Sequence, residues 1–416
     1  MRFPSLSPFA RLSALQFLVY AGMGSSGVFL SLYLREALAT SDGEGTLYFV
    51  GFVLFIQSLV GIAAAPVAGY LADRFKIENR ILAVCAAFVA VSAMLLLGLS
   101  SSAFTASGLG KRLALAMAAI VLNGLFLRPI VPLIDTETLE YLHGATGAST
   151  GYGSIRLYGS VGWFVFTLMV GLVLQATGRL NLSLVFYAGV FILLALMVSG
   201  GFRAKIQPVR IPWEHLKKDR MYQLFLVFVF IVVFATSGSF AFTGYMMQEA
   251  KASYFVIGFA FAVGALPEIP VFRASSGLLR RFGNRVLIPV GVLIIAAKLA
   301  WFITLPRMCN PWLFAFAQCI HGIGWAFFFS GLINLLDRQT HPDIRAMYQS
   351  LMSMVMTLAA AASGLAAGIV FELFGSSTLM ALDTLILVAA LIFFRFFVKG
   401  HAGEGVRAKV GETIAA

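Results

Sequence analysis

The sequence predicts an all-α polytopic membrane protein, with twelve transmembrane helices arranged as two pseudo-symmetric six-helix bundles. Three observations predict this fold class. The 416 residues are 60% hydrophobic and only 12% charged, with a mean hydropathy of +0.91, whereas about a quarter of the residues of a soluble domain are charged. Twelve apolar runs are long enough to cross a bilayer core of roughly 30 Å. A long hydrophilic connection near the middle of the chain leaves six runs on each side.

The twelve runs are predicted to be helices, because lipid offers no partner for unpaired backbone N–H and C=O groups. A membrane β-barrel would instead need strands that alternate between apolar and polar residues. The first run lacks a small-residue cleavage site after a short apolar core, which indicates a retained helix. In order, the predicted spans are 11–34, 46–72, 80–99, 112–134, 153–176, 181–202, 221–246, 253–275, 285–305, 312–335, 346–370 and 378–397.

The basic residues predict that both termini lie in the cytoplasm, and we expect an integral protein of the cell membrane (the cytoplasmic, or inner, membrane). With that orientation the cytoplasmic segments hold most of the 30 Lys and Arg residues, as the positive-inside rule requires. The net charge of +12 follows from basic loops that face anionic lipid. We therefore expect the lipid bilayer and no nucleic acid as a partner, and we expect a monomer without a cofactor or metal.

The hydrophilic connection divides the chain into two halves. It contains prolines and a cluster of basic residues, and it is the longest polar segment between spans. Such a division is typical of a duplicated six-helix unit with a ligand site between the copies. The predicted parts are an N-terminal bundle at 1–200, a cytoplasmic linker at 201–219, a C-terminal bundle at 220–400 and a cytoplasmic tail at 401–416.

Two short motifs support the duplication. GYLADRF at 69–75 ends the second span, and SGLLRRF at 276–282 ends the second span of the other half. The first motif resembles the loop between helices 2 and 3 of the major facilitator superfamily. The resemblance implies the major facilitator fold and a gating role for Gly69, Asp73 and Arg74. The second copy departs from the pattern because Arg280 stands in place of Asp73, so the gating role is carried over to the first copy only.

Four further stretches resemble one group within that superfamily, which contains phenylpropionate permeases, nucleoside-proton symporters and, more distantly, lactose permease. They are PLID at 132–135, YGSIRLYGSVGW at 152–163, ALPEIPVF at 265–272 and QCIHGIGWAFF at 318–328. In that group, acidic and basic side chains inside the bundles carry proton coupling and substrate contact. The resemblance assigns these roles to Asp135, Arg156, Glu268, Lys298 and His321.

Charged side chains inside membrane spans indicate function, because each costs roughly 2.5 to 3.5 kcal/mol at the centre of a helix. We predict that Glu268, Lys298 and His321 meet in one cavity of the C-terminal half and couple transport to protons. Burial disfavours a charged carboxylate and a neighbouring cation favours it, so Glu268 could exchange a proton there. The alternatives are a static ion pair between Glu268 and Lys298 and a hydrogen-bonded interior histidine at position 321.

Arg156 is predicted to bind substrate, since its planar fork of donors suits a carboxylate or sugar hydroxyls. Asp135 is its expected partner at rest, and the alternative is a purely structural pair. The small residues Gly364 and Gly368 predict a helix-contact surface. Four polar or aromatic residues in the spans are further candidates for substrate contact, although packing alone can account for each of them: Gln16, Tyr20, Asn123 and Trp325.

These features together predict a proton-coupled symporter that imports a small organic solute, such as a nucleoside, a sugar or an aromatic carboxylate, by alternating access. A proton-coupled efflux antiporter or a uniporter of the same fold is the alternative. An enzyme is disfavoured, because no G-x-S-x-G, H-E-x-x-H or paired catalytic aspartates are present. A receptor that transports nothing would not need intramembrane charges in both halves.

Overall fold

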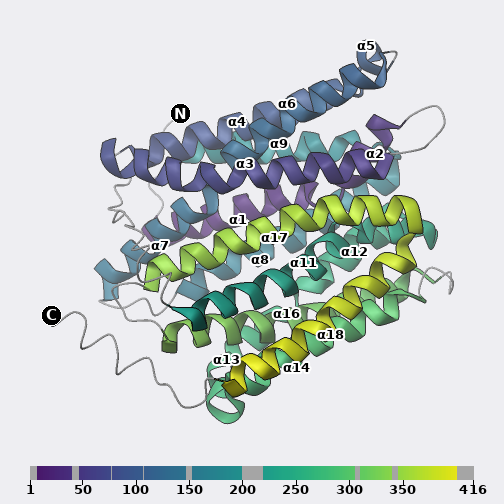
Figure 1. The fold of residues 1–416 in the computed structure, drawn as a ribbon. Helices are drawn as coiled ribbons and strands as arrows, with labels where there is room; N and C mark the ends of the chain where they lie inside the picture. The colour runs from purple at the N-terminus through teal and green to yellow at the C-terminus, as the bar shows by residue number, and fades with distance from the viewer. Residues whose placement is uncertain are drawn as a thin grey trace.

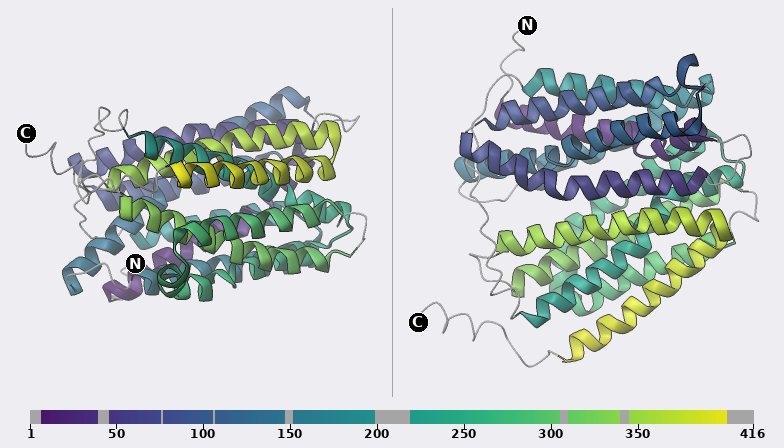
Figure 2. Two further views of the ribbon diagram at one scale, coloured as in Figure 1. Left: turned by 60° about the horizontal axis from the view of Figure 1, so that its bottom comes forward. Right: turned by 45° about the horizontal axis from the view of Figure 1, so that its top comes forward.

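The computed structural model is all-helical, and its helices form two groups that lie side by side (Figures 1 and 2). One group comes from the first half of the chain and the other from the second half, as the purple-to-teal and green-to-yellow colours show. The structure describes residues 7–39, 46–75, 77–105, 107–146, 152–198, 219–304, 310–339 and 345–400.

The first group contains nine helices in the described residues. Proline and serine begin the first of them, since the Ser7 side chain accepts a hydrogen bond from the Ala10 backbone N–H and Pro8 needs no partner for its nitrogen. The helices are α1 (Pro8–Ser26), α2 (Leu30–Leu38), α3 (Thr46–Phe75), α4 (Glu78–Gly98), α5 (Ser102–Thr105), α6 (Leu109–Leu127), α7 (Ile130–Thr146), α8 (Tyr152–Thr177) and α9 (Asn181–Val198).

The second group begins in the same way, with the Asp219 carboxylate accepting a hydrogen bond from the Tyr222 backbone N–H at 2.9 Å. Its helices are α11 (Arg220–Glu249), α12 (Tyr254–Ala265), α13 (Glu268–Phe282), α14 (Asn284–Phe302), α16 (Trp312–Gln339), α17 (Arg345–Phe374) and α18 (Ser376–Gly400).

The prediction of twelve spans is confirmed: in the described residues twelve helical segments are long and apolar enough to cross a membrane, six in each half. Three of these spans are broken into two helices, α1 with α2, α6 with α7, and α12 with α13. Proline explains two of the breaks, since Pro129 and Pro267 lie at the junctions and cannot donate the backbone hydrogen bond of a continuous helix. Both junctions bring predicted site residues near a helix start.

The two halves are joined mainly through three helix pairs, α3 with α17, α8 with α12, and α2 with α11. The closest approaches use glycine, as the sequence predicted for Gly364 and Gly368. A Cβ atom at Gly51 would lie 2.6 Å from the carbonyl oxygen of Gly364, and Gly171 and Gly258 face each other in the same way. All of these residues lie toward one end of the molecule. It is the end opposite to the C-terminal ends of α3 and α13, at Phe75 and Phe282. We call it the closed end.

Polar contacts between the halves reinforce the closed end. The Tyr245 hydroxyl donates to the Ser31 carbonyl oxygen, and the Ser31 hydroxyl donates to the Ala241 carbonyl oxygen. The Leu47 backbone N–H donates to the Glu372 carboxylate at 2.8 Å, so a carboxylate of α17 caps the first turn of α3. The structure is therefore a state in which the two halves are sealed together at this end.

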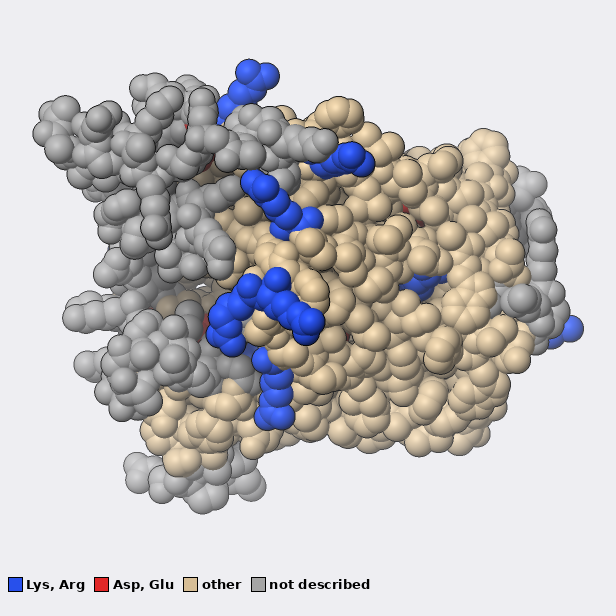
Figure 3. Space-filling model, turned by 90° about the horizontal axis from the view of Figure 1, so that it is seen from below, with Lys and Arg blue, Asp and Glu red and all other residues tan. Residues whose placement is uncertain are grey.

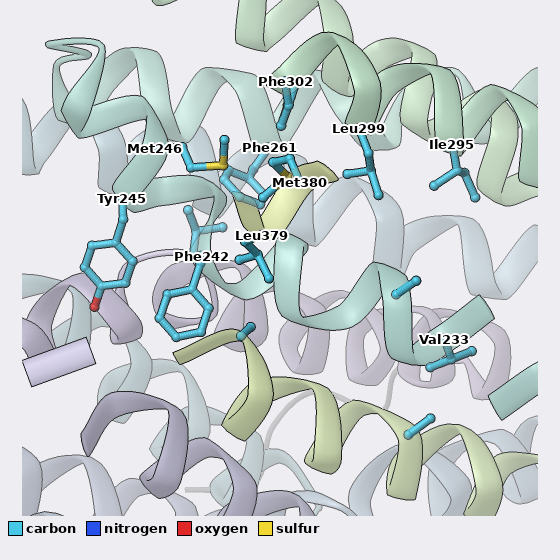
Figure 4. Close-up of a cluster of buried hydrophobic side chains, with 14 of the residues drawn as sticks. Val233, Phe242, Tyr245, Met246, Phe261, Ile295, Leu299, Phe302, Leu379 and Met380 are labelled. Carbon is cyan, nitrogen blue, oxygen red and sulfur yellow. The ribbon is translucent and has the colours of Figure 1, made fainter. Parts of the chain in front are cut away.

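Figure 4 shows the apolar packing behind this seal. Phe242, Tyr245 and Met246 of α11 lie near Leu379 and Met380 of α18, all of them buried. Phe302, Leu299 and Ile295 of α14 continue the cluster, and none of the labelled side chains other than tyrosine carries a polar group. The contacts between the halves thus adjoin the buried apolar core of the C-terminal bundle.

Replacing Tyr245 by Phe is expected to weaken the closed end and leave the rest of the fold intact. The ring and its contact with Arg35, whose guanidinium carbon lies 5.3 Å from the ring centroid, are kept. One hydrogen bond between the halves is lost, which costs about 1 kcal/mol and shifts the equilibrium away from closure by about fivefold. Hydrogen–deuterium exchange should increase in α2 and in the adjoining part of α11. Tyr48→Phe, at an exposed tyrosine, is the matched control, and equal exchange in both variants would contradict the assignment.

The predicted linker at 201–219 lies outside the described residues except for Asp219, and so does the tail at 401–416. The division into bundles at 1–200 and 220–400 therefore remains an expectation at its boundaries.

Candidate functional site

Glu268 is the first residue of α13, because the span breaks between α12 and α13 at Pro267. Pro267 is the N-cap of α13 and Glu268 follows it directly. The first turn of a helix has N–H groups without intrahelical partners, so Pro267 and Pro270 leave no gap in the hydrogen bonding, and a carboxylate is favoured by the helix dipole. The two prolines around Glu268 thus build a helix start inside the membrane span.

On the N-terminal side, α1, α7 and α8 bring four predicted residues together. The Arg156 guanidinium of α8 lies over the Tyr20 ring of α1, with its central carbon 3.9 Å from the ring centroid. Asp135 of α7 interacts electrostatically with the same tyrosine. The Gln16 side-chain N–H donates to the Asp135 carboxylate at 2.8 Å. Glycine makes room for this arrangement, since a Cβ at Gly159 would lie 2.7 Å from both Arg156 and Tyr20.

Glu268 and Arg156 interact electrostatically across the two halves of the molecule. Within the described part of the chain Glu268 makes no hydrogen bond or ion pair, so the two groups act on one another without direct contact. The expectation that Glu268 meets Lys298 and His321 in one cluster stays a prediction, since the electrostatic partner of Glu268 in this structure is Arg156. The Cγ atom of Glu268 lies 3.4 Å from the Cβ position of Gly322 on α16. The electrostatic partner of Glu268, Arg156, belongs to α8.

The other two members of the predicted cluster do lie together. Lys298 of α14 is buried, with 2% of its surface exposed, and its ammonium nitrogen lies 4.3 Å from the centroid of the Phe302 ring. His321 of α16 interacts electrostatically with Lys298. The His321 ring stacks on Trp325 with ring centroids 6.4 Å apart, so Trp325 belongs to the same cluster.

Asn123 lies apart from both groups. Its amide nitrogen donates to Ser92 at 2.9 Å and Tyr187 at 3.0 Å, and its oxygen accepts from Gln57 at 2.8 Å. The side chain is 3% exposed, and its hydrogen bonds are all made to helices of the N-terminal half. The structure therefore gives Asn123 a packing role in this state and places no other candidate residue against it.

The motif at 69–75 forms the last turns of α3 and is helical, not a loop. Gly69 faces open space, with nothing within 4 Å of its Cβ position. Arg74 lies over the rings of Tyr70 and Phe75. The side chain of Asp73 lies outside the described residues. The counterpart motif also ends a helix, since α13 terminates at Phe282, and the gating role of the first copy stays a prediction.

Sequence reasoning missed two buried polar residues near these groups. Gln318 is 2% exposed and its amide nitrogen has no hydrogen-bond partner; it lies one turn before His321 on α16, within a stretch already singled out. Asp383 of α18 is 5% exposed and accepts a hydrogen bond from Ser239 of α11. The rule that identified Glu268, an acid inside an apolar run, also identifies Asp383.

The described residues contain no group of three or more His, Cys, Asp or Glu side chains that is placed to hold a metal ion. The residues brought together above are separate charges and aromatic rings on facing helices. Arrangements of this kind bind and release a solute between two halves that move against one another.

Comparison with known proteins assigns the family. The model of the MFS_1 like family matches residues 9–382. The maltose permease of Geobacillus stearothermophilus is 26% identical over 291 residues, which cover 68% of each chain. A probable 3-phenylpropionic acid transporter of Escherichia coli (strain K12) is 25% identical over 317 residues, covering 71% of this chain and 74% of the relative.

A crystal structure of the nucleoside transporter NupG superposes with a TM-score of 0.76 at 18% identity, covering 95% of this chain and all of that one. This likeness confirms the predicted fold, with twelve spans in the arrangement of major facilitator transporters. The family match spans nearly the whole chain, so the protein acts as a secondary transporter of a small solute and not as an enzyme. The chain belongs to the MFS_1 like family of the major facilitator superfamily.

Proposed function

We propose that the protein is a proton-coupled symporter that imports a small organic solute. The observation that carries the proposal is the pair formed by Glu268 and Arg156. The two groups belong to different halves, lie inside spans and do not touch, so a solute or a proton between them changes how strongly the halves attract. When Glu268 is neutralised, the attraction to Arg156 is lost and the halves can rearrange.

The closed end supports an orientation of the protein in the membrane. Its contacts seal the side opposite to the ends of α3 and α13, and we assign that side to the exterior. Basic residues agree, since Arg280 and Arg281 form the last turn of α13 and Figure 3 shows Lys and Arg side chains gathered toward one end of the face it displays. The state described is then inward-facing, with both termini cytoplasmic in the cell membrane.

Proteoliposomes that enclose a pH-sensitive dye test this proposal. An inward gradient of the transported solute should acidify the lumen in a symporter, alkalinise it in an antiporter and leave it unchanged in a uniporter. Uridine, maltose and 3-phenylpropionate represent the three solute classes. Because a weak acid also crosses lipid unaided, liposomes without protein set the baseline for the carboxylate. Protein-dependent uptake without a change of lumenal pH would refute proton coupling.

A further inference from the structure

Lys298 is a buried cation whose charge the described residues leave uncompensated. Its side chain is 2% exposed, and none of the described residues places a carboxylate within ion-pair distance of it. Its neighbours are the Phe302 ring and His321. Arg156, in contrast, has two carboxylates near it. Asp135 and Arg156 both interact with Tyr20, and Glu268 interacts with Arg156 across the interface between the halves. An unpaired buried cation is costly, so a partner of opposite charge is missing from this state.

Two polar groups of α16, the helix that packs against α14, also lack partners. The amide nitrogen of Gln318 and Nδ1 of His321 are buried and make no hydrogen bond. Both residues come from one face of α16. Helices α14 and α16 pack along their length, and Gly291 contacts Gly324, so the antiparallel register places Lys298 at the level of the turn that holds Gln318 and His321. The Cβ of Gln318 lies 3.4 Å from the Cβ position of Gly264 on α12, at the same level between α12 and α14. A buried amide N–H normally donates a hydrogen bond, so an N–H without a partner indicates that an acceptor is absent from this state.

We propose that Lys298, Gln318 and His321 form a subsite for an anionic oxygen group of the solute, and that the solute is a carboxylate with an apolar or aromatic body. The ammonium supplies the charge and the amide supplies a second donor to the carboxylate oxygens. His321 presents a ring nitrogen to the same group. The inference rests on the proposed function, since it names the class of solute that the carrier takes.

The walls of the subsite favour the apolar body. Phe240 and Trp325 flank His321, with ring centroids 6.2 Å and 6.4 Å from its own, and Phe302 lies against Lys298. Sugars and nucleosides require several hydrogen-bonding partners around their hydroxyls, whereas these walls offer aromatic surface. Uncharged solutes would also leave the ammonium unpaired.

Binding to the purified full-length protein in detergent tests the subsite without any gradient. The probes are 3-phenylpropionate and its amide, which differ in charge and little in shape. The wild type should bind the carboxylate at least tenfold more tightly, as measured by calorimetry and thermal stabilisation. Lys298→Met should remove that preference, and Lys298→Arg should retain part of it. Lys251→Met, at an exposed lysine, makes the same change elsewhere and should have no effect.

The stability of the unliganded protein provides a second, independent measurement. Lys298→Met should raise the melting temperature without ligand, because it replaces an uncompensated charge by an apolar side chain of similar length. If Asp383, whose helix α18 packs against α14, neutralised Lys298 instead, this variant would be less stable and Asp383→Asn would restore stability in the double variant. That result would overturn the proposal, and so would the absence of any Lys298-dependent stabilisation by the carboxylate.

A failure of this test differs from a failure of proton coupling. Binding in detergent reports only on the subsite, whereas acidification of proteoliposomes reports on coupling. A protein that prefers uridine or maltose and still acidifies the lumen would refute the subsite alone. One that binds 3-phenylpropionate through Lys298 and moves no protons would refute the coupling alone.

Discussion

Replacing Glu268 by Gln is expected to abolish accumulation of solute against a gradient while leaving exchange of solute across the membrane intact. The amide cannot release a proton, and the change removes the negative charge that interacts with Arg156 across the two halves. Reorientation then no longer depends on protonation, so the solute equilibrates but is not concentrated. We expect at least a tenfold loss of gradient-driven accumulation, since interactions between charges in spans are worth more than the 1.4 kcal/mol that corresponds to a factor of ten.

Two assays in proteoliposomes separate these effects. Uptake driven by an imposed pH gradient should fall to the level reached without the gradient, and counterflow of labelled solute should persist. Glu36→Gln is the matched control, because the same chemical change is made at an exposed carboxylate of α2. Gradient-driven accumulation at the wild-type level in Glu268→Gln would show that Glu268 does not couple transport to protons.

A leucine at position 51 is expected to prevent the two halves from meeting at the closed end. A Cβ atom there would lie 2.6 Å from the Gly364 carbonyl oxygen and 3.1 Å from the Gly368 Cα, and backbone atoms cannot move aside as a flexible side chain can. Overpacking of this kind costs roughly 1 to 3 kcal/mol, which shifts the balance between the two access states by about five- to more than a hundredfold. Gly51→Leu should therefore hold the carrier open at this end and reduce transport at least tenfold.

Spin labels at positions 36 and 251, which are exposed on the two halves at the closed end, report this change directly. Their separation should increase in Gly51→Leu, while the melting temperature falls little because each bundle keeps its own core. Gly189→Leu is the control, since nothing lies within 4 Å of its Cβ position. A label separation equal to that of the wild type would mean that α3 and α17 can still pack at the closed end with leucine at this position. Glycine would then not be required there.

The sequence predicted the fold because membrane helices are determined by composition and length. Runs of about 20 apolar residues need no information about neighbours to be identified as spans. The predicted and observed spans agree closely, as in 46–72 against Thr46–Ala72. The breaks within spans were less evident, although Pro267 is a local signal and its consequence, a helix start at Glu268, follows from the missing N–H.

The pairing of the charges could not be predicted in the same way. Their positions in the sequence placed Glu268, Lys298 and His321 on spans of one half, but the rotation of each helix about its axis decides which side chains face one another. In this structure Glu268 interacts electrostatically with Arg156, and His321 interacts with Lys298. Asn123 shows the same limit, because spacing identifies an amide in a span and cannot tell whether its partners are helices or solute.

The broken helix has a mechanical consequence for the transport cycle. The span is interrupted at Pro267, where α12 ends and α13 begins, and such a joint bends more easily than an intact helix. Helix α12 can stay packed against α8 while α13 tilts about this joint. Glu268 is the first residue of α13, so a tilt changes the direction in which its carboxylate points more than the position of its backbone.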